Sequence, residues 1–250
     1  MRRPLAAALV VAYAAPASAQ FPPEQLKNIK AFPASIQVPV LIDSMKAFTR
    51  ALGVRCTYCH VGREDQSLDQ YDFAADDNVT KEKARTMIRM VNAINTQFLA
   101  ALPARRDPPI TVSCITCHRG VAQPRPIQQV VMTAYQTSGA DSAESLYRAL
   151  RARYLGSAAY DFGEVPLTDV GAALQAAGKG DDAIRFYKLN IELLPTSGFG
   201  YRQLGLSYLE ARDTASALAA FQKRLALQPA NGEAKQMVDA LTKHPLKRQR

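Results

Sequence analysis

What the sequence lacks narrows what the protein can be. Beyond the first nineteen residues, no stretch is apolar over the ~18 residues that a membrane-spanning helix needs, so no such span is expected in the mature chain. Cysteine and histidine are scarce, with four and three residues in a chain of 250. A metal or redox site built from these side chains therefore has few positions to draw on.

All four cysteines fall in two short motifs, Cys56–His60 (CTYCH) and Cys114–His118 (CITCH). Cys-x-x-Cys-His is the attachment signature of c-type haem. Two thiols three residues apart lie on one side of a helical turn, where each can form a thioether with a haem vinyl group. The histidine that follows is held with a ring nitrogen toward the iron. The sequence predicts two c-type haems, bound by Cys56, Cys59, Cys114 and Cys117 and ligated by His60 and His118.

Other readings of the cysteines explain less. A zinc site also uses Cys-x-x-Cys pairs, but its usual spacer of about 12–20 residues is far shorter than the helix-forming segment between Cys59 and Cys114. A thioredoxin-like redox pair needs a βαβ setting, for which the sequence gives no sign. Two structural disulfides would leave the repeated histidines unexplained. Zinc is the main alternative.

The second axial ligand of each iron follows partly by elimination. His60 and His118 leave only His244, which stands beside Pro245 in a basic tail and is typical of a solvated histidine. At least one haem therefore lacks a second histidine, and we expect methionine ligation at both. After loss of the leader, the remaining methionines are Met45, Met87, Met90, Met132 and Met237.

Two of these methionines lie on helices expected beside the haem motifs. Met45 is on the apolar stripe of a helix predicted from Val40 to Ala51, and Gly53 ends that helix just before Cys56. Met87 lies within about 45° of the centre of the apolar face of a second helix, predicted from Lys81 to Leu102. Met45 and Met87 are the predicted iron ligands.

Met90 lies about 100° from the centre of the same apolar face and is the alternative to Met87. Filling of a hydrophobic core is the alternative role for any of these methionines. Methionine ligation raises the reduction potential relative to two histidines, which suits an electron carrier.

The C-terminal half carries an internal repeat with an offset of 34 residues, the period of tetratricopeptide helix pairs. The matched positions are Gly171 and Gly205, Ala183 and Ala217, Tyr187 and Phe221, Leu193 and Leu227, and Pro195 and Pro229. The predicted fold is all-α, a dihaem cytochrome domain followed by a small repeat domain. Its expected parts are a signal peptide (1–19), the dihaem domain (20–126), a linker (127–141), tetratricopeptide-like repeats (142–243) and a basic tail (244–250).

The N-terminus predicts export. Met1-Arg2-Arg3 is followed by the apolar run Leu5–Ala15 and by Ala17-Ser18-Ala19, which reads as a cleavage site after Ala19. We therefore expect a periplasmic protein. The net charge of +9 falls to about +7 without the leader, and a basic surface attracts acidic partners. Nucleic acid is disfavoured by the export signal.

Part of the chain, about 33–126, resembles the photosynthetic reaction-centre cytochrome c subunit family. The resemblance is carried by Met45–His60, Tyr71–Asp77 (YDFAADD), Arg85–Asn95 and Val112–Gly120. In that family a methionine-bearing helix and a turn precede each Cys-x-x-Cys-His, which implies Met45 and Met87 as ligands here. Members usually carry four haems where this chain has two motifs, and their later distal histidine would fall near Ala101. The family passes electrons to a photo-oxidised chlorophyll pair.

These observations favour an electron carrier rather than an enzyme. The candidate partners are redox proteins, among them a photosynthetic reaction centre or a periplasmic dehydrogenase, with protein docking on the repeat domain. The alternative is a dihaem peroxidase-like enzyme, which needs an open iron and a distal acid–base group that no spare histidine can supply. A redox-sensing repeat scaffold is a third reading.

Overall fold

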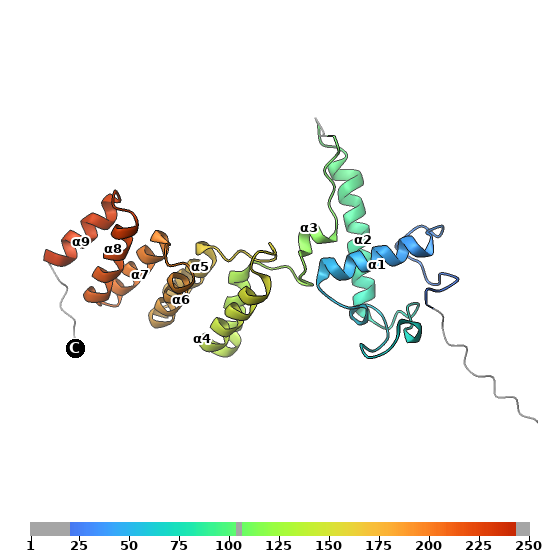
Figure 1. Ribbon diagram of the computed structural model, residues 1–250, viewed down its shortest axis with the longest axis horizontal. Helices are drawn as coiled ribbons and strands as arrows, with labels where there is room; N and C mark the ends of the chain where they lie inside the picture. Colours follow the sequence, from blue (N-terminus) through green and yellow to red (C-terminus); the bar gives the residue numbers. More distant parts are fainter. Residues whose placement is uncertain (1–20, 104–106, 244–250) are drawn as a thin grey trace, which may run out of the picture. The chain divides into compact units, whose positions relative to one another are not determined.

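The computed structural model describes residues 21–103 and 107–243 (Figure 1). The predicted signal peptide and the basic tail with His244 lie outside the described residues. Within them, regular structure is helical apart from a single β-bridge between Val61 and Asp72. No helix in these ranges combines the length and apolarity required to cross a bilayer. The chain forms two compact units that divide between Ala122 and Gln123.

The first unit contains the two helices predicted around the first haem motif. Its elements are α1 (Val38–Leu52), η1 (Cys56–Tyr58), η2 (Leu68–Gln70), α2 (Val79–Ala93), η3 (Ile94–Leu99) and α3 (Cys114–His118). A proline in the first turn of α1 fits there because that backbone N–H has no helical partner. The predicted second helix is continuous from α2 into η3, but η3 is a wider π-helical turn. Such turns are often found at functional sites.

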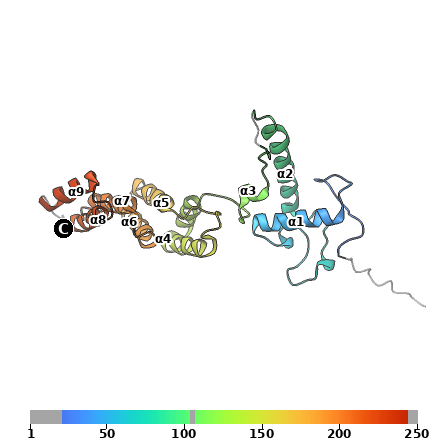
Figure 2. The same cartoon turned by 45° about the horizontal axis from the view of Figure 1, so that its top comes forward.

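The second unit consists of packed helix pairs. Its elements are α4 (Ile127–Tyr154), α5 (Glu164–Ala176), α6 (Gly180–Leu193), α7 (Gly198–Glu210), α8 (Thr214–Leu227) and α9 (Gly232–Lys243). Helices α5 and α7 begin 34 residues apart, as do α6 and α8. From α5 to α9 each helix packs on the next, which Figure 2 shows from a second direction. The all-helical fold with C-terminal repeats is confirmed.

The repeated glycines and aromatics meet inside each helix pair. A Cβ atom on Gly171 would lie 2.4 Å from a ring carbon of Tyr187, and one on Gly205 would lie 2.8 Å from a ring carbon of Phe221. Each glycine therefore gives room to the aromatic ring of the following helix. Tyr187 and Phe221 are both buried as a result.

The predicted linker, 127–141, differs from the structure because most of it is helical. It forms the first part of α4, which breaks at Gly139 (φ 79°, ψ −178°). Ile127 and Val131 are four residues apart and share one helix face, which is buried in the core of the second unit. The four-residue spacing of these apolar side chains therefore favours a helix, although the flanking sequence is typical of a loop.

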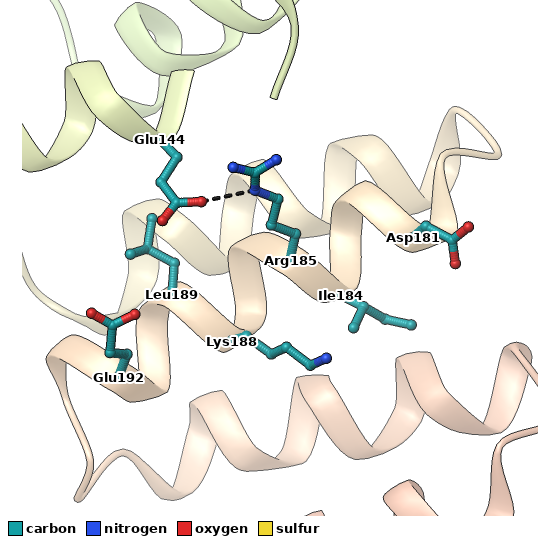
Figure 3. Close-up of a pocket in the computed structure, with 7 residues that line it drawn as sticks. All are labelled: Glu144, Asp181, Ile184, Arg185, Lys188, Leu189 and Glu192. Atoms are coloured by element: carbon teal, nitrogen blue, oxygen red, sulfur yellow. Dashed lines mark hydrogen bonds and ion pairs between the residues drawn. The ribbon is translucent and has the colours of Figure 1, made fainter. Parts of the chain in front are cut away.

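Ion pairs join α4 to α6 around a shallow pocket (Figure 3). Arg185 pairs with Asp141 and Glu144, and Arg148 pairs with Glu144 and Glu192, at 2.5–2.8 Å. Tyr135 donates a hydrogen bond to Asp182 at 2.5 Å across the same two helices. Two arginines face three carboxylates in these pairs, and the pocket lining holds no cysteine, histidine or methionine. The pocket is a part of the α4–α6 interface.

Substitution of Gly205 tests the packing of the repeats. Gly205→Ala places a methyl group against the ring of Phe221, so overpacking should lower the free energy of unfolding of the second unit by about 1–3 kcal/mol. Gly232→Ala is the control, because that position starts α9 in open space. Urea unfolding followed by circular dichroism measures both. Equal stability of the two variants would contradict the packing described.

Candidate haem-binding sites

Both Cys-x-x-Cys-His motifs form a helical turn, as their spacing predicted. In the first motif, η1 is followed by a hydrogen bond from the His60 backbone N–H to the carbonyl of Cys56 (2.9 Å). The second motif is the short helix α3, which begins at a capping box between Ser113 and Thr116. None of the four cysteines forms a disulfide, and Cys117 is the most exposed. Each pair of thiols is thus available on one turn.

Two asparagines on one helix anchor the two motifs. The amide of Asn78, at the start of α2, donates to the carbonyl of Tyr58 (3.0 Å), while its oxygen accepts from the Thr80 N–H. Asn95, in η3, donates to and accepts from the backbone of Val112 (2.8 Å each), two residues before Cys114. The continuous α2–η3 helix therefore positions both haem motifs.

Sequence reasoning missed both anchors. Asn78 caps α2 and also reaches the first motif. A hydrogen-bonding amide in the middle of a predicted apolar face is the signal that could have revealed Asn95. Such a side chain needs a partner when it is partly buried.

A close backbone contact joins the segments that carry the motifs. Gly53 ends α1 in the left-handed region (φ 67°), three residues before Cys56. The Gly120 N–H donates to the carbonyl of Ala51 (2.8 Å), two residues after His118. A Cβ on Gly53 would lie 2.1 Å from the Gly120 carbonyl oxygen, so only glycine permits this approach. The motifs, 58 positions apart in sequence, are thereby held side by side at the end of α1.

The two histidines are in states suited to metal binding. Nδ1 of His118 lies 3.0 Å from the carbonyl oxygen of Val121. A proton on Nδ1 donates to that oxygen and leaves the lone pair of Nε2 for a metal, the usual arrangement of ligating histidines. The pKa of His60 is lowered to about 4, mainly by burial and secondly by the positive charge of Lys81. Its imidazole is therefore neutral at physiological pH.

The loop 71–77 closes over His60. The ring of Phe73 contacts the His60 ring edge-on (centroids 5.0 Å apart) and stacks on Tyr71 (5.5 Å). The ammonium of Lys81 donates to the carbonyls of Phe73 and the next two residues at 2.6–3.0 Å. Hydrogen bonds from Arg85, and then from Lys30, hold the pKa of the Asp76 carboxyl well below its usual range. This charged network fixes the loop against α2.

The thiols do not assemble a metal site of their own. Burial raises the pKa of the Cys59 and Cys114 thiols, so these remain protonated at neutral pH. Within the described part of the chain, which includes both motifs, no three His, Cys, Asp or Glu side chains converge as metal ligands. The ligand set that a zinc site requires is therefore not present in this arrangement.

The predicted methionine ligands occupy different surroundings. Met45 is half-buried on α1. Met87 and Met90 on α2 are 41% and 44% exposed, so exposure alone does not separate them. Their directions around the helix differ: Met87 lies about 80° and Met90 about 140° from the direction of Asn95, which faces the second motif.

The first unit has almost no hydrophobic core of its own. Among the described residues, 21 hydrophobic side chains are buried, but only Ala51 and Tyr71 precede Gln123. Large apolar side chains of this unit are instead exposed, among them Met87, Met90, Phe98, Leu102, Ile110 and Ile115. A unit of this size ordinarily needs a buried apolar core. A large apolar group such as haem fits this unit, because it would cover surface that the chain leaves exposed.

Comparison with known proteins finds a matching family and similar relatives. Residues 64–165 match the family described as the photosynthetic reaction centre cytochrome C subunit. The interval includes the second motif, begins just after the first and ends at the start of α5. Cytochrome c-554 of Chloroflexus aurantiacus is 33% identical over 99 residues, and the photosynthetic reaction center cytochrome c subunit of Rubrivivax gelatinosus is 34% identical over 90 residues.

These alignments cover 36% and 32% of this chain, which spans only 22% of the length of either relative. The described residues are helical, and one segment, residues 64–165, matches a cytochrome family. The resemblance of that segment to the reaction-centre cytochrome c subunit family is confirmed.

Two solved structures are similar to about half of the chain. The first tetratricopeptide domain of Spaghetti (RPAP3), bound to an HSP90 peptide, has a TM-score of 0.32 and 17% identity, covering 47% of this chain and 88% of its own. PcrH from Pseudomonas aeruginosa has a TM-score of 0.32 and 19% identity, covering 46% and 89%.

The Gly53–Gly120 contact can be tested with a matched pair of variants. Gly53→Ala adds a methyl group against a backbone oxygen and should lower the free energy of unfolding of the first unit by about 2–4 kcal/mol. Gly120→Ala also places alanine at positive φ but in open space, and should cost only about 1–2 kcal/mol. Denaturant unfolding of the full chain, read at the haem absorption, measures both losses. The contact is refuted if the two variants are equally stable.

Proposed function

We propose that this protein is a periplasmic dihaem c-type cytochrome that carries single electrons between redox partners. One haem is bound through Cys56 and Cys59 with His60 as ligand, and the other through Cys114 and Cys117 with His118. The observation that carries the proposal is the first unit itself. Its described residues form two haem-attachment turns, leave large apolar side chains exposed and bury only two hydrophobic side chains.

The chemistry of each site supports this assignment. Covalently attached haem supplies reversible one-electron chemistry at iron when bound. The protein then has to hold neutral imidazoles in fixed orientations, and His118 is oriented by the Val121 carbonyl. Asn78 and Asn95 hold the backbone of the motifs, so both haems would be carried on a rigid frame. Rigidity suits electron transfer because it limits structural change on reduction.

Methionine sulfur is the proposed second ligand at both irons. Met45 is assigned to the first haem, because its helix ends at Gly53 immediately before the first motif. Met87 is assigned to the second haem, because it lies closer than Met90 to the direction in which Asn95 reaches the second motif. Histidine–methionine ligation raises the reduction potential relative to two histidines, which suits an electron carrier.

Location and partners follow from the predicted leader and from the relatives. The N-terminus has basic residues followed by an apolar run and a predicted cleavage site after Ala19, which supports export to the periplasm. One relative is named as a photosynthetic reaction center subunit, which supports a reaction centre as partner. A periplasmic dehydrogenase is the alternative, because this chain spans only 22% of that relative. The helix pairs of the second unit offer a surface for protein docking.

Methionine ligation is testable in the ferric spectrum of the holoprotein. A band in the far red reports methionine–iron bonds, and Met45→Ala and Met87→Ala should each remove about half of it. Each should also lower the potential of one haem. Met90→Ala is the matched control on α2 and should leave the band intact.

Two outcomes would contradict this scheme. Loss of the band in Met90→Ala but not in Met87→Ala would reassign the second ligand. A high-spin ferric spectrum of the unmodified protein, together with turnover of peroxide, would indicate the peroxidase-like enzyme instead of a carrier.

A further inference from the structure

Two buried cations lie on α2, next to the loop that contacts the first haem motif. The side chains of Lys81 and Arg85 are one turn apart on α2, and the residues are only 8% and 6% exposed. Burial of a positive charge is costly unless the charge is paired and hydrogen-bonded. The described residues of this unit include so few buried side chains that two buried cations at one place call for a reason beyond packing.

The contacts of Lys81 place its positive charge close to the first motif. Its ammonium donates to three successive carbonyls, those of Phe73 (3.0 Å), Ala74 (3.0 Å) and Ala75 (2.6 Å). The Phe73 ring in turn rests against the ring of His60. A single loop residue thus separates the ammonium from the proposed iron ligand.

The carboxylates around Lys81 do not neutralise its positive charge on the side that faces the interior of the first unit. Asp76 pairs with Lys81 (3.1 Å), Arg85 (2.8 Å) and Lys30 (2.6 Å), and Glu82 pairs with Arg85 (3.1 Å) and Arg89 (3.2 Å). Four cations therefore face two carboxylates in this network. The two buried members are both cations, while the side chains of Asp76 and Glu82 are 37% and 58% exposed.

We propose that Lys81 is a positioning residue that raises the reduction potential of the first haem, and that Asp76 opposes it. The proposal rests on the proposed function. Reduction adds one electron to the iron, so a fixed positive charge nearby favours the reduced form and a fixed negative charge disfavours it. For a separation of ~10 Å at an effective dielectric constant of ~20, one charge changes the reduced-to-oxidised ratio by roughly tenfold.

Two substitutions of opposite charge separate this effect from a structural one. Lys81→Met removes the positive charge and keeps an unbranched side chain, whereas Asp76→Asn removes the negative charge and keeps the shape. In a redox titration of the full-length holoprotein, Lys81→Met should lower one midpoint potential and Asp76→Asn should raise the same one. Each shift should be about three- to tenfold in the reduced-to-oxidised ratio. A merely structural role would loosen the loop in both variants and move the potential in one direction.

Two controls complete the design. Lys83→Met removes an exposed cation from the same helix and should leave both potentials unchanged. Glu82→Gln removes the more exposed carboxylate and should give a smaller upward shift. It replaces Asp76→Asn if that variant does not fold.

The outcomes distinguish this proposal from the proposed function. Failure of the unmodified protein to carry haem would refute the function. Two bound haems with potentials that are unchanged in Lys81→Met, or that move in the same direction in Lys81→Met and the carboxylate variant, would refute the role of Lys81 alone.

Discussion

The first unit has few buried hydrophobic side chains among its described residues, and the rest of its structure follows from this constraint. Among the described residues, this unit buries Ala51 and Tyr71 as its hydrophobic side chains, while the second unit buries nineteen. Burial of apolar surface is the main favourable term in folding. The repeats satisfy that requirement from their own sequence, whereas the first unit leaves Phe98, Leu102 and Ile115 exposed. The proposed haems would supply the missing core, so that cofactor and fold depend on one another.

The remaining features of this unit serve to hold two short turns in place. Helix α2 with η3 is held between Asn78 and Asn95, each of which bonds to the backbone of a different motif. The Gly53–Gly120 contact closes the arrangement at the end of α1. In the first unit, main-chain hydrogen bonds and a close glycine contact hold the elements in position, whereas side-chain packing does so in the repeats. Such contacts fix orientation with little buried area.

Much of this could be predicted from the sequence, for physical reasons. The haem motifs, the helices around Met45 and Met87 and the 34-residue repeat depend on local spacing, which sequence displays directly. Gly171 with Tyr187 and Gly205 with Phe221 are clear examples, because the repeated positions meet in space. The contacts that were missed join distant positions: Asn95 with Val112, and Gly120 with Ala51. The helical start of α4 was missed because its buried face depends on helices that follow later in the chain.

The central claim is that two haems are covalently bound to this chain, and the intact mass of the exported protein tests it most directly. The protein should be produced in a host that attaches haem to exported chains, purified in full length and measured by mass spectrometry under denaturing conditions, which release non-covalent haem but leave thioether-bound haem attached. The account predicts the mass of the processed polypeptide plus two haems, together with the absorption of a c-type cytochrome. A colourless product with the mass of the polypeptide alone would contradict it.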